Sequence, residues 1–155
     1  MKLLLPASLQ AWIEDEARKA FPRECCGLIE GTRQDGEAHA IALHPARNLA
    51  TRADRFEIAP DDHFAALKTA RANGRDLIGC YHSHPNGKAA PSATDLAGAG
   101  EEDFFWLIAS LSARDAPVTV AAFVYSAAGF FPANLSGAVG ALGADFVTSS
   151  GKARN

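Results

Sequence analysis

The sequence predicts an α/β domain in which helices flank a mixed sheet. Segments with helical periodicity and short strand-like apolar segments are interspersed along the chain, which is typical of that fold class. The length of 155 residues suits one domain with a sizeable core, and 48% hydrophobic with 21% charged residues is ordinary for a globular protein. We expect the domain to occupy residues 1–131, and residues 132–155, rich in Gly, Ala and Ser, to form a flexible C-terminal extension.

The N-terminal third of the chain predicts one helix followed by two strands. Ser8 is a suitable cap for a helix that runs to about Phe21 and is stopped by Pro22. One side of this helix is apolar at helical spacing, through Leu9, Trp12, Ile13, Ala17, Ala20 and Phe21. A buried strand, a turn and a second strand are predicted next, at residues 25–30, 34–36 and 37–44.

The middle of the chain predicts a short strand, a second helix and a longer strand. Pro60 opens the helix, because its fixed φ suits the first helical position, and Asn73-Gly74 ends it. Phe64, Leu67 and Arg71 fall on one face of this helix. The two strands are expected at residues 55–58 and 76–84.

The last part of the predicted domain contains a short helix and a β-hairpin. Ser92 starts the helix, which ends near Gly98 or Gly100. Two strongly strand-like runs follow at residues 104–111 and 118–126. The polar loop between them, residues 112–115, indicates that they pair as a hairpin.

Composition and charge exclude several classes of protein. The net charge of −3 and the absence of a basic block argue against a nucleic-acid partner. No apolar run is long enough to span a bilayer, and the leucines at residues 3–5 stop too early for a signal peptide. Cys25, Cys26 and Cys80 are odd in number, and two are adjacent, so they form no disulfide framework. We therefore expect a cytoplasmic protein with no membrane partner.

The segment from His82 to Asp95 carries the residues with the clearest chemical pattern. His82 and His84 point to the same face of the predicted strand, because side chains alternate along a strand, and Pro85 ends it. A loop then returns the chain so that the next helix starts with Ser92 and Asp95 in one turn. Two imidazoles and one carboxylate form a three-ligand set for Zn²⁺, of the kind that leaves a fourth position for water. Cobalt or nickel would also suit these ligands.

A hydrolytic zinc site also needs a general base and a donor for the developing oxyanion. The Ser92 hydroxyl is placed to be that donor. The candidates for the base are Glu24, Glu30, Glu37, Glu57, Glu101 and Glu102, and spacing alone does not choose between them. Ile78 and Cys80 precede the histidines at strand spacing, so we expect both to form an apolar floor under the metal.

A different interpretation explains Ser92 and Asp95 without a metal. Ser92-Ala93-Thr94-Asp95 matches a helix capping box, with Asp in place of the more usual Glu. The upstream histidines favour metal ligation over this interpretation. For Cys25 and Cys26, we expect the role of small buried hydrophobes, because the sequence indicates no helix N-terminus or cationic group that would activate a thiol.

The string from His82 to Asp95 resembles the signature of the JAMM (MPN-plus, JAB-type) zinc metalloproteases: His, any residue, His-Pro, six residues, Ser, two residues, Asp. The segment Arg23–Gly31 also resembles the first strand of the compact prokaryotic members, which carries a glutamate. The resemblance implies a cytidine-deaminase-like α/β core, His82, His84 and Asp95 as zinc ligands, Glu24 as the base and Ser92 as the oxyanion donor.

The resemblance further implies hydrolysis of a peptide or isopeptide bond after the C-terminal Gly-Gly of a ubiquitin-like or sulfur-carrier protein. Three alternatives stay open at this point. The first is a non-catalytic binding module of the MPN fold, the second is a cell-wall or phage-type peptidase of the same family, and the third is another zinc hydrolase. A nucleoside deaminase ranks low, because it pairs His-x-Glu with a later Pro-Cys-x-x-Cys, which is absent here. The sequence does not indicate an oligomeric state.

Overall fold

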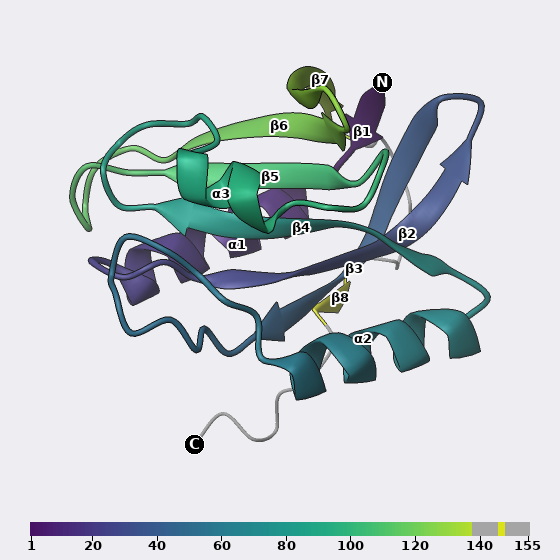
Figure 1. Cartoon of the computed structure of the whole chain (residues 1–155), viewed down its shortest axis with the longest axis horizontal. Helices are drawn as coiled ribbons and strands as arrows, with labels where there is room; N and C mark the ends of the chain where they lie inside the picture. The colour runs from purple at the N-terminus through teal and green to yellow at the C-terminus, as the bar shows by residue number, and fades with distance from the viewer. Residues whose placement is uncertain (138–145, 148–155) are drawn as a thin grey trace.

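The computed structural model describes residues 1–137 and 146–147. In chain order the elements are β1 (Lys2–Leu4), α1 (Ala7–Ala20), β2 (Cys26–Gln34), β3 (Glu37–Ala46), α2 (Pro60–Ala72), β4 (Asp76–His84), α3 (Ala93–Gly98), β5 (Phe105–Ser110), β6 (Thr119–Ser126), β7 (Gly129–Ser136) and β8 (Phe146–Val147) (Figure 1). The predicted α/β class, with a mixed sheet flanked by helices, is confirmed.

The described strands form one sheet in the order β1-β7-β6-β5-β4-β2-β3-β8. β4 and β5 are parallel, while β2 pairs antiparallel with both β3 and β4. β1 is parallel to β7 along one edge and parallel to β3 along the other. The strands from β1 to β3 therefore form a closed ring of hydrogen-bonded neighbours, and the ring is closed by three residues of β1.

Helices cover both faces of this sheet. α1 lies behind β4 and β5, whereas α3 lies in front of them and α2 runs along the β2–β3 side (Figure 1). The core on the α1 face contains buried residues of the helix and the sheet, including Leu9, Ile13, Ala17, Ile29, Ile78, Tyr81, Phe105 and Leu107. The core on the α2 face contains Leu28, Ala66, Ala70, Leu77, Cys80, Phe104 and Trp106. The two cores fix β4, which lies between them.

Helix α1 has the predicted apolar side but not the predicted cap. Leu9, Ile13 and Ala17 are its buried residues. Ser8 was expected to cap the helix, but it lies inside the first turn, and Pro6 occupies the cap position without a side-chain hydrogen bond. Proline is well suited to the start of a helix because its φ is already helical and no N–H is lost.

The hairpin of β2 and β3 is longer than predicted. β2 continues through the expected end near Glu30 to Gln34, and β3 continues to Ala46. Asp35 and Gly36 form the turn with φ values of 52° and 77°, the left-handed pair that a two-residue type I′ hairpin requires. The predicted strand at residues 55–58 is reduced to one bridge between Asn48 and Ile58.

The face of one strand residue was predicted wrongly. In α2, which has the predicted bounds, Ala66 and Ala70 are buried, and Phe64, on the face that it shares with Leu67 and Arg71, is 69% exposed. In β4, Ile78 was expected beside Cys80 under the histidines, but it packs in the α1-side core. The β2–β4 register shifts at this point, so that Ile29 pairs with Gly79 and Glu30 with Leu77. Ile78 is therefore a bulge residue, and a bulge moves the side chains before it to the other face.

The remaining predicted elements are confirmed, and three strands were not predicted. β4, α3 and the β5–β6 hairpin lie where expected. β1 has only three residues, and β7 contains Pro132, which argues against a strand in a sequence pattern. β7 also crosses the boundary predicted after residue 131. The predicted flexibility of the C-terminal extension falls largely on residues outside those described. No helix among the described residues is long and apolar enough to cross a membrane.

Candidate metal centre

Three elements bring the predicted site residues together at one end of β4. His82 and His84 lie on the same face of the strand, and Asp95 comes from the first turn of α3. Glu24 comes from the residues that lead into β2. The Ser83 N–H donates to the Cys25 carbonyl at 3.1 Å, which extends the β2–β4 pairing past Cys26, and the Cys25 N–H donates to the Ser83 Oγ atom at 2.8 Å.

Three donor atoms converge in this cluster. The Nε2 atoms of His82 and His84 are 2.9 Å apart, and they lie 3.2 Å and 3.1 Å from the Asp95 Oδ2 atom. All three side chains are buried, with exposed fractions of 0%, 4% and 5%. Tetrahedral zinc with bonds of about 2.0–2.1 Å holds its donors roughly 3.3 Å apart, so these distances fit a single cation.

The hydrogen bonding of His84 indicates which of its nitrogens carries a lone pair. Nδ1 lies 2.9 Å from the Lys88 carbonyl oxygen, which only accepts, so Nδ1 carries the hydrogen. Nε2 of the neutral ring therefore directs its lone pair toward the Asp95 carboxylate, an arrangement that requires a proton or a cation between them. Although burial lowers the pKa of His84, the hydrogen bonds to Asp95 and Lys88 more than offset it and raise the pKa. Burial lowers the pKa of His82, whose ring is therefore neutral at pH 7.

Asp95 is placed for both of the roles that the sequence left in competition. The Ser92 Oγ atom accepts from the Asp95 N–H at 3.0 Å, and Asp95 Oδ2 accepts from the Ser92 N–H at 2.8 Å, so the capping box is present. The same Oδ2 atom faces both histidines. Burial favours the protonated carboxyl, but the interactions with the His82 and His84 rings outweigh it and lower the pKa of Asp95. The cap therefore holds an ionised carboxylate in position for the cluster.

Glu24 is the glutamate that reaches this cluster. A carboxylate oxygen of Glu24 and a ring nitrogen of each histidine lie within 4.8 Å of one another. Glu24 is 5% exposed, and its buried Oε1 atom has no hydrogen-bond partner among the described residues. Burial raises the pKa of Glu24 to about 7, with His84 opposing the shift and Asp95 adding to it. A carboxylate with such a pKa is suited to take up and release a proton near neutral pH.

The whole chain can now be compared with known proteins. The family described as prokaryotic homologs of the JAB domain matches residues 6–124. The chain belongs to this family. JAB-family relatives include a desampylase of Haloferax volcanii, 35% identical over 119 residues, which are 73% of this chain and 84% of the relative. A probable TtuB-protein conjugate cleaving protease of Thermus thermophilus is 30% identical over 95 residues, 61% of each chain.

A solved structure shows the same architecture as this JAB-family chain. The solution structure of a protein from Desulfitobacterium hafniense superposes with a TM-score of 0.79 at 26% identity. The match covers 96% of this chain and 97% of the other. The fold is therefore shared over nearly the whole chain.

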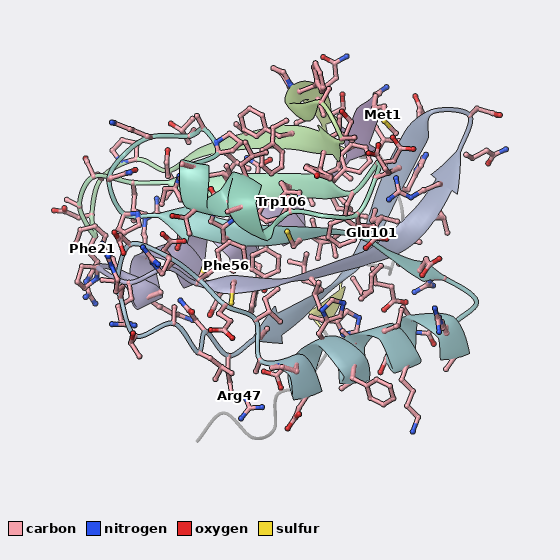
Figure 2. The ribbon with its side chains drawn as sticks, viewed as in Figure 1. Met1, Phe21, Arg47, Phe56, Glu101 and Trp106 are labelled. Atoms are coloured by element: carbon pink, nitrogen blue, oxygen red, sulfur yellow. The ribbon has the colours of Figure 1, made fainter. Side chains whose placement is uncertain are left out.

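The JAB site contains an aromatic group that was not predicted from the sequence. The ring of Phe56 stacks on His82, with centroids 4.3 Å apart and planes at 22°. Trp106 contacts both Phe56 and His82 edge-on, with centroids 5.8 Å away in each case. The labelled side chains of Phe56 and Trp106 lie together in front of the sheet (Figure 2). Phe56 is 26 residues from His82, so no local sequence pattern links the two. The one feature of the sequence that could have indicated a role for Phe56 is its apolar side chain in a polar loop.

Other titratable residues of the JAB domain lie apart from the centre. Glu30, another candidate base, is fully buried, and its Oε2 atom lies 2.7 Å from His44 Nε2. Its Oε1 atom accepts from Asn73 and Arg75 at 3.1 Å each. Burial raises the thiol pKa of Cys25 to about 11 and of Cys26 to about 12, so both are neutral thiols at pH 7, which is unsuitable for a nucleophile.

Proposed function

We propose that this chain is a zinc-dependent isopeptidase that cleaves after the C-terminal Gly-Gly of a ubiquitin-like or sulfur-carrier protein. The observation that carries the proposal is the buried Glu24 carboxylate, whose Oε1 atom has no hydrogen-bond partner among the residues described, beside three converging donor atoms. The names of the Haloferax and Thermus relatives support this choice of substrate class. His82 Nε2, His84 Nε2 and Asp95 Oδ2 would hold the Zn²⁺ ion.

Bound Zn²⁺ acts as a Lewis acid that lowers the pKa of water and polarises a carbonyl oxygen. The remaining steps belong to the chain's own groups. The Glu24 carboxylate accepts a proton from the attacking water and delivers it to the leaving lysine nitrogen as the carbon–nitrogen bond breaks. A pKa near 7 suits both transfers, because neither protonation state of the carboxyl is strongly favoured.

The Ser92 hydroxyl still has one hydrogen-bond donor available for the reaction. Its Oγ atom accepts the Asp95 N–H in the capping box, and this leaves the hydroxyl hydrogen free to donate. Ser92 is exposed, so a substrate carbonyl can reach this hydroxyl. We assign this hydroxyl to the oxyanion that develops on the carbonyl oxygen. The Lys88 carbonyl keeps His84 in the tautomer with its hydrogen on Nδ1, so the Nε2 lone pair stays directed at the centre.

The first test is metal content, measured by elemental analysis of the full chain. We expect about one zinc per wild-type chain, and loss of the zinc in His84→Ala and Asp95→Ala. Wild-type protein without metal, even after zinc is supplied, would contradict the proposal and leave the capping box as the role of Asp95.

The second test is cleavage of a Gly-Gly-ended ubiquitin-like protein joined to the side chain of a lysine peptide. We expect Glu24→Gln to keep its zinc and to lose about 10²- to 10⁴-fold in kcat, the usual contribution of a general base. Tight binding of the conjugate without turnover by zinc-loaded wild type would instead indicate a non-catalytic binding module. Cleavage of peptide substrates alone would indicate a cell-wall or phage-type peptidase.

A further inference from the structure

Asn48 uses the full hydrogen-bonding capacity of its side chain. The Nδ2 amino group donates to the Glu24 carbonyl at 3.0 Å and to the Arg55 carbonyl at 3.2 Å. The Oδ1 atom accepts from the N–H groups of Ala50 and Glu57, both at 2.9 Å. A primary amide has two donors and two acceptor positions, so all four are occupied. A surface asparagine can satisfy its amide with water, whereas Asn48 forms all four hydrogen bonds with backbone groups of the chain.

These four bonds join two parts of the proposed metal centre. One bond ends on the backbone of Glu24, whose side chain faces the histidines. Two others end on Arg55 and Glu57, the residues directly before and after Phe56. The bridge between Asn48 and Ile58 and the 2.8 Å bond from Leu49 N–H to the Glu57 carbonyl hold the same segment in register. Asn48 therefore connects Glu24 to the segment that carries Phe56.

The ring of Phe56 matters because His82 lacks the usual means of orientation. A ligand histidine normally donates its second ring N–H to a carbonyl or carboxylate. His84 does so through Lys88, whereas the buried Nδ1 atom of His82 has no hydrogen-bond partner among the described residues. The Nε2 atom of His82 lies 3.2 Å from Asp95 Oδ2, while the face of the ring stacks on the Phe56 side chain and Trp106 lies at its edge. Packing against Phe56 therefore helps to set the orientation of His82, where no hydrogen bond to Nδ1 does.

We propose that Asn48 is a positioning residue that holds Glu24 and the Phe56 segment in one frame around the metal centre. The inference rests on the proposed function and adds a residue that touches neither metal nor substrate. Loss of the Asn48 amide removes one hydrogen bond from the backbone of Glu24. It also removes two from the residues that flank Phe56, whose ring stacks on His82. Both the proton transfer and the binding of metal should weaken together.

The test compares two variants of Asn48 with a matched asparagine elsewhere. Asn48→Ala removes all four bonds, while Asn48→Asp keeps the two acceptor positions and loses both donors. Asn73→Ala is the control, because its amide also donates over a long sequence distance, to Glu30, but outside the site. Each full-length variant is titrated with Co²⁺ alone and followed by its visible absorption spectrum. Cleavage of the Gly-Gly-linked lysine conjugate then gives kcat and KM separately.

We expect Asn48→Ala to weaken Co²⁺ binding about 10-fold, to change the Co²⁺ spectrum, and to lower kcat at least 10-fold with little change in KM. Asn48→Asp should lose a similar factor in kcat, because the bond to Glu24 is broken. It should lose less Co²⁺ affinity, because Glu57 is still held. Asn73→Ala should lower only the melting temperature.

Unchanged kcat and an unchanged Co²⁺ spectrum in Asn48→Ala, with a melting temperature lowered as in Asn73→Ala, would overturn the positioning role alone. A wild-type chain that binds no Co²⁺ and cleaves no conjugate would overturn the proposed function, and the positioning role with it.

Discussion

At the scale of single residues, Glu24 combines burial with an Oε1 atom that has no hydrogen-bond partner in the described part of the chain. A buried carboxylate is normally paired, because the ionised form loses its hydration. Glu30 follows that rule, with three hydrogen-bonding neighbours. Glu24 does not, and burial raises its pKa from 4.5 to about 7. The contrast distinguishes a carboxylate that serves the fold from one that we propose takes part in proton transfer.

This difference predicts a pH-dependent cost of keeping Glu24 in place. Because the folded-state pKa is raised, the stability linked to Glu24 is fully present below the unfolded pKa of 4.5 and is lost as the pH rises through about 7. In metal-free protein, Glu24→Gln should therefore be more stable than wild type at pH 8, by on the order of 2 kcal/mol, and similar to it near pH 4.5. Thermal unfolding in a chelating buffer at the two pH values measures this. An equal difference at both values would contradict it.

At the scale of elements, the buried Glu30 network ties α2 to the sheet. Glu30 of β2 contacts His44 of β3, Asn73 at the end of α2 and Arg75 just before β4. Burial works to raise the pKa of Glu30, but the hydrogen bonds from these three neighbours outweigh it and lower the pKa. The network holds the C-terminal end of a helix whose two fully buried residues, Ala66 and Ala70, are small.

The network predicts acid sensitivity of the opposite sign. Since the folded pKa of Glu30 is lowered, its contribution is present above the unfolded pKa of 4.5 and is lost as the pH falls through the folded value. We expect Glu30→Gln to destabilise the chain by about 3 kcal/mol at pH 7, the usual cost of breaking a buried ionic group, and by less below pH 4. Urea unfolding at pH 7 and pH 3.5 measures both. If Glu30→Gln loses the same free energy of unfolding at both pH values, the charge of Glu30 does not contribute to stability.

The parallel pairing of β4 and β5 depends on a close approach at Gly79. A Cβ atom at this position would lie 2.5 Å from the carbonyl oxygen of Phe105, its partner in β5. We expect Gly79→Ala to displace β5 and lower stability by about 1–3 kcal/mol, as other overpacked core positions do. Gly98→Ala is the control, because nothing lies within 4 Å of the added atom. Equal urea midpoints for the two variants would refute the close approach.

The elements also show what the sequence could predict about the site. His82, His84, Ser92 and Asp95 were found because one strand, one loop and one helix start place them by local geometry. Ile78 was assigned to the wrong face, because a bulge depends on the partner strand rather than on β4 itself. Asn48 and Phe56 were missed as site residues, because their contacts span 24 and 26 residues and carry no fixed spacing.

At the scale of the whole molecule, β1 holds the ring of strands closed. It pairs with β3 and β7, and its central residue Leu3 is completely buried. The sequence did not predict this, because three residues give no periodicity and Pro132 obscures β7. Because β1 joins β3 to β7, loss of its pairing should lower the free energy of unfolding of the whole described domain.

We expect Leu3→Ala to lower the free energy of unfolding by about 2–5 kcal/mol, because it creates a cavity where β1 meets the α1-side core. Lys2→Ala, whose side chain is partly exposed and forms a 3.4 Å ion pair with Glu37, should cost under about 1 kcal/mol. Urea unfolding of both variants tests this. Similar losses for the two would show that β1 contributes only backbone pairing.

The pairing of β1 with β7 also constrains the order of events during synthesis. Synthesis proceeds from the N-terminal side, so β1 is made long before residues 134–136, and one of its edges stays uncovered until they emerge. All of the proposed site residues, from 24 to 95, emerge well before that. A nascent chain that already contains every proposed site residue therefore still has one edge of β1 open to other chains.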